Sequence, residues 1–393
     1  MAELSTGATG ALAIAMWDFS WLERRWPGGG YEDWERALDG LVERGYDAVR
    51  IDAYPHLVAA DPDGAFTLIP AWTMHDWGSP AKVTVSPMPA LVDFIRLADA
   101  RGLKVALSTW FRQDLDDTRM SITGPVDLAD SWIATLDHIR AAGLLHTIWY
   151  VDLCNEWPQL FWAPFTVPGG EEGTDDLLRT SPDGRQWTNT ALARVRAAYP
   201  ELPLCFSISA QFDTVLAEDV SHYDLLEPHV WMVLAGPRRF YEELDYDGRD
   251  PVQYELLADQ AERLYRSSPE EWRIQLSNMI TDMADWSRWR NLPLVTTESW
   301  AIVCWKDGPG LDWGWVRELC EFGVDEAIKH GRWMGIATSN FCGPQYRGMW
   351  DDVDWHRRLT SRIHDAPVPL LVAECLDGSD RRQPAQTRPT PVR

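Results

Sequence analysis

The sequence repeats one pattern along most of its length: a short run of apolar or β-branched residues, followed by a segment with apolar residues at helical spacing. The helical segments, such as 31–46 and 89–103, end near a glycine, as helix C-termini commonly do. Eight such runs within 393 residues predict an α/β fold, a (β/α)8 TIM barrel with long βα loops. The predicted strands span 11–17, 47–53, 104–110, 147–153, 203–209, 225–232, 292–299 and 334–340.

The main alternative, a doubly wound sheet, requires a glycine-rich phosphate turn after its first strand. The chain instead continues "DFSWLERRWPGGG" after Trp17, without a G-x-G-x-x-G motif that opens a helix. No repeat or low-complexity block divides the sequence. We therefore expect one barrel domain over 1–376 and a disordered, polar and proline-rich tail over 377–393.

Charge and cysteine usage limit the partners and the compartment. A formal net charge of −24 opposes binding to nucleic acid or to an anionic membrane. The N-terminus has no basic stretch, and its apolar run 11–17 is too short to span a bilayer, so we expect neither an export signal nor an anchor. The six cysteines show no C-x-x-C spacing, which indicates reduced thiols and a cytoplasmic protein.

Two glutamates follow predicted strands that should end at the same mouth of the barrel. Glu156 comes after the fourth strand in "YVDLCNEWPQL", and Glu298 ends the seventh in "LVTTESW". Carboxylates are rarely buried without a partner, although each could also be a structural ion-pair or helix-cap acid. Two carboxyl groups at one mouth are what hydrolysis of a glycosidic bond with retention needs.

The segments "VRIDAYP", "DLCNEWP" and "TTESW" resemble the strand signatures of clan A glycoside hydrolases, the cellulase-like retaining enzymes, over about residues 10–365. The resemblance implies that Glu156 is the acid/base and Glu298 the nucleophile. It implies that Asn155 binds the sugar hydroxyl beside the anomeric carbon. Arg50 would lie near Glu298 and help to keep it ionised, and His229 would orient Glu298 or a substrate hydroxyl.

The chain also departs from the pattern of this family. Trp231 stands where members usually place a tyrosine that binds the nucleophile. The third strand ends "LSTWFRQD" without the frequent histidine, and the eighth ends with Asn340 and Phe341 instead of tryptophan. The resemblance therefore implies the catalytic pair but not the subfamily or the sugar.

Tryptophan is unusually frequent, with 23 residues. Those at helical spacing are expected in the core, whereas those at strand ends or in long loops can stack on sugar rings. We expect about half of this second group to contact ligand, and less firmly a few polar residues as hydroxyl binders. The aromatic group is Trp17, Trp72, Trp77, Trp110, Trp157, Trp162, Trp231, Trp300 and Trp305, and the polar residues are Asp18, His75, Asp76, Gln211 and Asn340.

Other chemistries fit the sequence less well. A metal-dependent barrel enzyme needs acids and histidines converging at strand ends, but the fifth strand runs into "SISAQFD" and the eighth ends "SNF". No H-E-x-x-H, G-x-S-x-G or P-loop motif occurs, so we expect neither metal nor cofactor.

The sequence thus predicts a retaining β-glycosidase for short oligosaccharides or glycosides, with a small carbohydrate as its only predicted partner. Long loops after strands two, four and six favour exo-action, because they can close one end of the groove. The alternatives are a catalytically silent carbohydrate-binding barrel and a transglycosylase. The identity of the sugar and the oligomeric state stay open.

Overall fold

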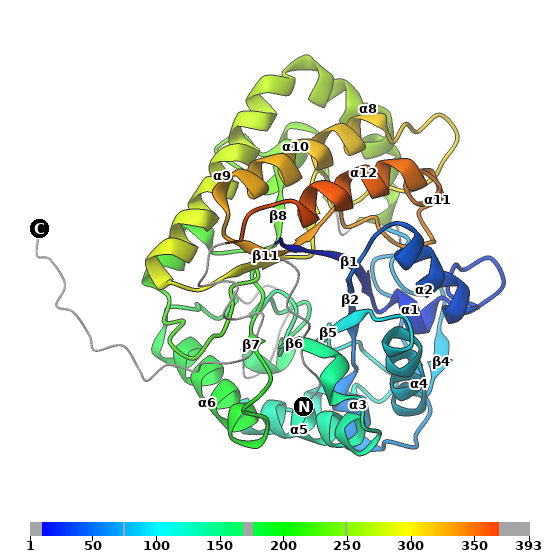
Figure 1. Ribbon diagram of the computed structural model, residues 1–393, viewed down its shortest axis with the longest axis vertical. Helices are drawn as coiled ribbons and strands as arrows, with labels where there is room; N and C mark the ends of the chain where they lie inside the picture. Colours follow the sequence, from blue (N-terminus) through cyan, green and yellow to red (C-terminus); the bar gives the residue numbers. More distant parts are fainter. Residues whose placement is uncertain (1–9, 74, 168–175, 248–249, 369–393) are drawn as a thin grey trace, which may run out of the picture.

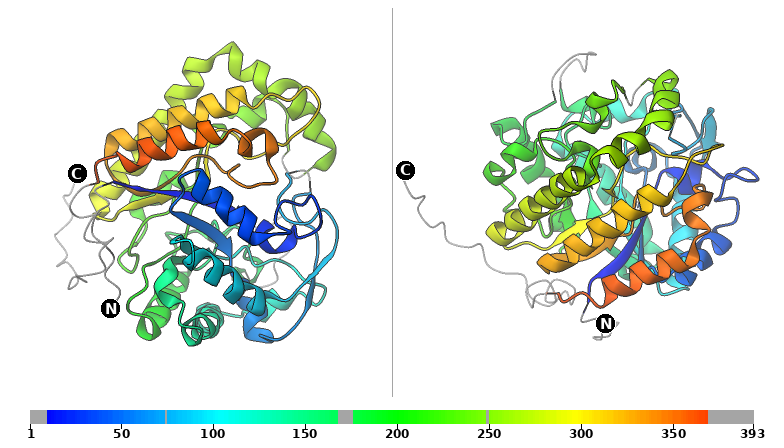
Figure 2. Two further views of the ribbon diagram at one scale, coloured as in Figure 1. Left: turned by 45° about the vertical axis from the view of Figure 1, so that its right-hand side comes forward. Right: turned by 90° about the horizontal axis from the view of Figure 1, so that it is seen from above.

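The structure, a computed structural model, describes residues 10–73, 75–167, 176–247 and 250–368. The predicted tail 377–393 lies outside the described residues, as does Cys375, so the proposed domain boundary at 376 stays a prediction. Helices surround the strands in all views (Figures 1 and 2). Figure 1 shows α9, α10 and α12 on one side of the strands and α5 and α6 on the other.

The strands form a parallel barrel, which confirms the predicted (β/α)8 fold. Seven strands pair in the order β7-β6-β5-β2-β1-β11-β9, and β8 pairs in parallel with β10. The β8 segment, residues 226–231, closes the gap between the two end strands of this sheet. Its parallel bridges are Ile208↔Pro228, on the side of β7, and Leu226↔Leu294, on the side of β9. The strands are β1 (Leu12–Asp18), β2 (Ala48–Asp52), β5 (Lys104–Ser108), β6 (Ile148–Asp152), β7 (Leu204–Cys205), β8 (Val230–Trp231), β9 (Leu294–Thr296), β10 (Ser299–Trp300) and β11 (Trp333–Ala337).

The helices start and end at residues suited to those positions. Asp33, Ser181 and Asp352 each cap a helix by accepting a backbone N–H, and Gly331 ends another helix at a positive φ of 59°. The barrel helices are α2 (Trp34–Glu43), α4 (Pro87–Asp99), α5 (Pro125–Ala141), α6 (Pro182–Ala198), α8 (Tyr254–Ser267), α9 (Pro269–Arg290), α10 (Gly314–His330) and α12 (Val353–His364). Shorter helices are α1 (Ser20–Glu23), α3 (Pro55–Ala60), α7 (Phe240–Glu243) and α11 (Arg347–Trp350).

Several predicted elements differ from the structure. The segment after the second strand is not one long irregular loop, because it contains α3 and the antiparallel hairpin of β3 (Phe66–Leu68) and β4 (Val83–Val85). The fifth and sixth predicted strands are much shorter than expected. Among the described residues between them, the only helical segment is the 3-10 helix Phe212–Ala217. The periodicity of the sequence did not reveal the hairpin, because its short β-branched strands lie among turn residues within one long segment.

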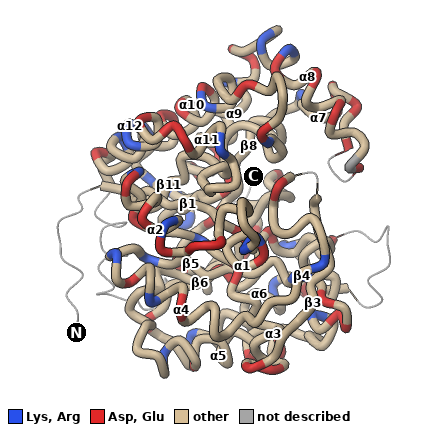
Figure 3. Tube along the Cα trace, turned by 90° about the vertical axis from the view of Figure 1, so that its right-hand side faces the viewer, with Lys and Arg blue, Asp and Glu red and all other residues tan. Residues whose placement is uncertain are grey.

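Acidic and basic residues are interspersed along the helices and the connecting segments (Figure 3). Within the described ranges, no helix is both long and apolar enough to cross a bilayer.

The contact between β10 and α10 has no room for an added side chain. Trp300 is completely buried, and a Cβ on Gly323 would lie 2.5 Å from Cγ of Trp300. Glycine at this helical position therefore lets the strand and helix approach closely.

We expect Gly323→Ala to lower the free energy of unfolding by about 1 to 2 kcal/mol, because overpacking against the rigid indole outweighs the better helix propensity of alanine. Chemical denaturation measures this change. The control is Gly124→Ser at the N-cap of α5, where an added Cβ meets nothing within 4 Å and serine is a favoured cap. A Gly323→Ala protein as stable as the wild type would contradict the packing described here.

Candidate active site

Glu156 and Glu298 meet at the mouth of the barrel. Glu156 follows β6, and Glu298 lies between β9 and β10. One carboxylate oxygen of each glutamate and a ring nitrogen of His229 all lie within 4.8 Å of one another. Glu156 is 9% exposed and Glu298 2% exposed, so both carboxyl groups are held in a nearly closed space. The structure therefore brings together the two acids that the sequence placed on different strands.

The backbone at Glu156 adopts a conformation that non-glycine residues seldom occupy. Its φ is 51°, in the left-handed region, where residues often cluster at functional sites. Its N–H donates to Oγ of Ser207 at 2.8 Å, and that hydroxyl donates to Oδ2 of Asp152 at 2.8 Å. The backbone N–H of Ser207 also donates to Asp152, at 2.8 Å. Asp152 at the end of β6 thus fixes the turn that presents Glu156.

Arg50, on β2, is completely buried and reaches the ends of several strands. Its Nη1 donates to Oε1 of Glu298 at 3.2 Å, which confirms the predicted proximity of these two residues. Its Nη2 donates to Asp152 at 2.7 Å, to Oδ1 of Asn155 at 2.8 Å and to Oγ of Ser108 at 3.0 Å. One guanidinium therefore orients both Asn155 and Glu298.

Glu227 completes the surroundings of Arg50. Its Oε1 lies 3.1 Å from Nε of Arg50 and accepts a hydrogen bond from Thr297 at 2.7 Å. Burial acts to lower the pKa of Arg50, but Glu227, Asp152 and Glu298 together raise it well above its ordinary value. Arg50 is consequently a permanent cation inside the barrel.

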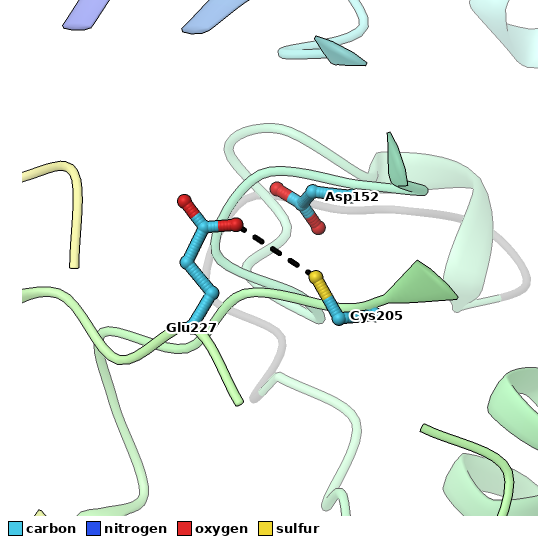
Figure 4. A group of neighbouring side chains, drawn as sticks. All are labelled: Asp152, Cys205 and Glu227. Atoms are coloured by element: carbon cyan, nitrogen blue, oxygen red, sulfur yellow. Dashed lines mark hydrogen bonds between the residues drawn. The ribbon is translucent and has the colours of Figure 1, made fainter. Parts of the chain in front are cut away.

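Asp152, Cys205 and Glu227 also form a compact group (Figure 4). The thiol of Cys205 donates to Oε2 of Glu227 at 3.7 Å, and burial raises the pKa of this thiol well above its ordinary value. Both carboxylates are already paired with Arg50. A neutral thiol beside two ion-paired acids belongs to the Arg50 network and is a poor set of metal ligands.

The two central glutamates have opposite pKa shifts. Burial raises the pKa of Glu298 to about 7; His229 and Arg50 oppose this rise, and Glu156 adds to it. Burial also acts to raise the pKa of Glu156, but hydrogen bonding to His229 and Trp162 outweighs it and holds this pKa below its ordinary value. Burial therefore favours the neutral form of Glu298 in the substrate-free site, whereas hydrogen bonding favours the ionised form of Glu156.

His229 contacts Glu156 more closely than Glu298, which was one of the two partners expected for it beside a substrate hydroxyl. Its Nδ1 lies 3.0 Å from Oε1 of Glu156 and 3.6 Å from Oε1 of Glu298. Burial acts to lower the pKa of this imidazole, but the two carboxylates raise it above its ordinary value. A ring nitrogen between the two acids is well placed to pass a proton from one to the other.

Aromatic residues from two loops enclose Glu156. The indole of Trp162 donates to Oε2 of Glu156 at 3.0 Å. The ring of Trp72 is stacked on Trp162 with centroids 6.1 Å apart, and Trp77 and Phe161 contact Trp72 in turn. Trp72 and Trp77 lie between β3 and β4, in the long segment after β2, whereas Phe161 and Trp162 follow β6. The two long loops thus meet beside the acid pair.

Several predicted ligand contacts are used by the fold instead. The rings of Trp17 and Trp300 are fully buried, and their indoles donate to Cys342 and Ala337 carbonyls. Trp17 packs on Phe94 of α4, and Trp300 packs on α10. These positions follow strand ends, but their side chains point toward the helices, which strand position alone did not reveal.

The remaining aromatic candidates are also tied to protein groups. Trp110 lies under the Arg50 guanidinium, with 4.7 Å from Cζ to the ring centroid. The indole of Trp231 donates to Asn340 at 3.1 Å, so these two candidates bind each other. Trp305 lines an outer cavity of about 630 Å³ beside α8, and neither Glu156 nor Glu298 lines that cavity. Trp157 packs on Trp187 and Phe206.

The polar residues that were expected to bind sugar hydroxyls are also bound to protein groups. Asp18 is 1% exposed, binds the backbone N–H of Ser20, and has a pKa raised well above its ordinary value, mainly by burial and in smaller part by nearby acids that include Glu298. His75 contacts the thiol of Cys304 at 3.0 Å, and Asp76 lies 3.9 Å from Arg24. Gln211 binds backbone groups of Leu177 and Arg179. Of these four, Asp18 has the clearest electrostatic link to the glutamates.

Sequence reasoning missed several residues of the network, among them Asp152, Ser207 and Glu227. Each lies at or near the end of a barrel strand, and Asp152 stands four residues before Glu156 in the motif already singled out. A polar residue inside an otherwise apolar strand run was the signal that could have found Asp152 and Glu227.

Comparisons with known proteins identify the family of this chain. Residues 14–364 match the family model "Cellulase-like", described as sugar-binding cellulase-like. A candidate glycoside hydrolase from Parabacteroides distasonis ATCC 8503 is 43% identical, with a TM-score of 0.89 over 94% of this chain and 99% of that chain. No match was found among curated proteins.

More distant structures share the fold alone. A beta-glycosidase has a TM-score of 0.52 at 12% identity, covering 97% of this chain and 100% of its own. A family 5 mannosidase from Rhizomucor miehei gives 0.52 at 12% identity, covering 93% and 98%. With the family match across the whole barrel, the chain belongs to the sugar-binding cellulase-like family of glycoside hydrolase-like TIM barrels.

Proposed function

We propose that this protein is a retaining β-glycosidase that acts by double displacement. The observation that carries the proposal is the close approach of Glu156 and Glu298, because one carboxylate oxygen of each lies within 4.8 Å of one oxygen of the other. Retaining enzymes hold their two carboxyl groups about 5 to 5.5 Å apart, whereas inverting enzymes need about 6.5 to 9.5 Å to admit a water. The observed spacing supports attack by one carboxylate on the sugar.

In this mechanism Glu298 attacks the anomeric carbon while Glu156 protonates the departing oxygen. Glu156 then removes a proton from the water that releases the sugar. The contact at 3.2 Å between Arg50 and Glu298 supports the nucleophile role, because a neighbouring cation favours the ionised carboxylate.

The first step requires the proton on Glu156, although the substrate-free site favours Glu298. We infer that substrate binding reverses this distribution and that the proton crosses by way of Nδ1 of His229, which is near both acids. As Glu298 attacks, its negative charge is lost in the new ester bond, and negative charge develops on the oxygen of the breaking glycosidic bond. The proton is then most useful on Glu156, beside the leaving oxygen.

Asn155 supplies a further contact in the proposed complex. Its Oδ1 accepts from Arg50 at 2.8 Å, and its buried Nδ2 has no hydrogen-bond partner among the described residues. An unpaired buried donor is costly, so a ligand oxygen at this position would be favoured. This geometry supports the proposed bond from Asn155 to the hydroxyl beside the anomeric carbon.

The enclosure of the acids supports exo-action on short glycosides. Glu298 is only 2% exposed, and the loops that carry Trp72 and Trp162 meet beside Glu156. A site closed in this way accepts the end of a saccharide chain more readily than its middle.

Hydrolysis itself is tested with a panel of aryl β-glycosides. We expect phenol release from at least one member and a loss of kcat/KM of about 100-fold or more in Glu298→Gln, because an amide cannot form the glycosyl ester. The matched control is Glu227→Gln, which alters another acid bound to Arg50 and should cost much less activity. Silence across the panel together with tight oligosaccharide binding would favour the non-catalytic barrel.

The pH dependence of kcat/KM should be bell-shaped. The active form holds one proton in the glutamate pair, so activity should fall as pH rises through about 7, the pKa of Glu298 in the free site, because the last proton is then lost. It should also fall at low pH, when both acids are protonated. In Glu156→Gln, assayed with an activated leaving group, the fall above neutral pH should disappear. A persistent fall in that variant would contradict the acid role of Glu156.

The product distribution tests exo-action. A tetrasaccharide of the accepted linkage, labelled at its reduced end, should give label first in the trisaccharide, because one terminal sugar is released per event. Chromatography of early time points measures this order. Early label in the disaccharide without any monosaccharide would show internal cleavage.

A further inference from the structure

Trp162 makes a direct hydrogen bond to one of the two central acids. Its Nε1 lies 3.0 Å from Oε2 of Glu156, and its ring is 3% exposed. From the sequence, Trp162 was expected only to stack on a sugar ring. Its polar edge, however, faces the carboxylate, so it can affect the chemistry of Glu156 as well as the shape of the site.

The groups around the Glu156 carboxylate are mainly donors. Oε2 accepts from Trp162 at 3.0 Å and from Nε2 of Gln159 at 3.4 Å, while Oε1 faces Nδ1 of His229 at 3.0 Å. An indole N–H and an amide NH2 can donate but cannot accept. Hydrogen bonds of this kind stabilise the carboxylate relative to the carboxylic acid.

The position of Trp162 is fixed by other aromatic rings. Trp72 stacks on it at an interplanar angle of 17°, Phe161 meets it edge-on at 4.5 Å between centroids, and Phe19 lies 6.2 Å away. Phe19 follows β1, Trp72 lies between β3 and β4 in the segment after β2, and Phe161 follows β6. Residues after three strands therefore hold the indole against Glu156.

We propose that Trp162 is a positioning residue that orients the carboxyl group of Glu156 and favours its ionised form. The proposal rests on the proposed function, in which Glu156 is the acid/base. By stabilising the carboxylate, Trp162 makes Glu156 a stronger acid toward a leaving oxygen. The same bond keeps Oε2 from rotating, so that proton exchange takes place at Oε1, which faces His229.

The titratable groups that face Glu156 come from two other elements. His229 lies in the β8 segment, and Glu298 lies between β9 and β10. Arg50 of β2 stands behind Glu298, and burial raises the pKa of the neighbouring Cys154 thiol, which stays neutral. A substitution at Trp162 leaves each of these groups chemically unaltered, although Trp162→Phe removes part of the indole ring together with its N–H.

The test compares Trp162→Phe with Trp72→Phe. Both replace an indole in the same stack, but the buried Nε1 of Trp72 has no hydrogen-bond partner among the described residues. In Trp162→Phe we expect the acid-side midpoint of the kcat/KM profile to move up by about 1 pH unit, the size expected for one hydrogen bond to a carboxylate. In Trp72→Phe the midpoint should stay in place. Equal midpoints in the two variants would overturn the proposal.

A second measurement does not depend on activity. The protonation of Glu156 can be followed by infrared difference titration, with Glu156→Gln identifying its carboxyl band. An upward shift in Trp162→Phe but not in Trp72→Phe supports the proposal even if every glycoside is refused, in which case the proposed function alone fails. An unshifted band in a folded Trp162→Phe protein overturns the role of Trp162, whether or not the protein hydrolyses glycosides.

Discussion

A single buried guanidinium organises the site. Arg50 lies at contact distance from Asp152, Glu227 and Glu298, and also binds Asn155, while its face covers Trp110. Buried acids are tolerated only where a partner offsets their desolvation, and breaking such a network leaves charges unpaired in the core. Arg50 therefore holds together the ends of β2 and β6 and the segments that contain Glu227 and Glu298.

The same network leaves the two central glutamates in unequal environments. Arg50 is shared among three acids and neutralises only part of their charge, and burial raises the pKa of Glu298 to about 7. Glu156 is stabilised as a carboxylate by donors from His229 and Trp162. A pair whose proton can move between two acids suits a reaction in which each acid changes protonation during the cycle. Such buried charge commonly lowers stability in exchange for function.

Much of this arrangement could be predicted from sequence because parallel strands end at one face of a barrel. That rule brought Glu156 and Glu298 together, whereas the place of Arg50 beside Glu298 was implied by the resemblance to clan A glycoside hydrolases. It did not give side-chain direction, so Trp17 and Trp300 were predicted as sugar contacts although they pack toward the helices. The preference of His229 for Glu156 depends on distances of 3.0 and 3.6 Å that no motif encodes. The hairpin β3–β4 was missed because its strands have three residues each.

The central claim is that Glu298 forms a covalent bond to the sugar. The most direct measurement is intact-protein and peptide mass spectrometry after incubation with an activated 2-deoxy-2-fluoro β-glycoside of the accepted sugar, which slows release of the intermediate. We expect one added fluoroglycosyl group per chain, located on the peptide that contains Glu298. A label on Glu156, or turnover of the parent glycoside with inversion and no adduct, would contradict it.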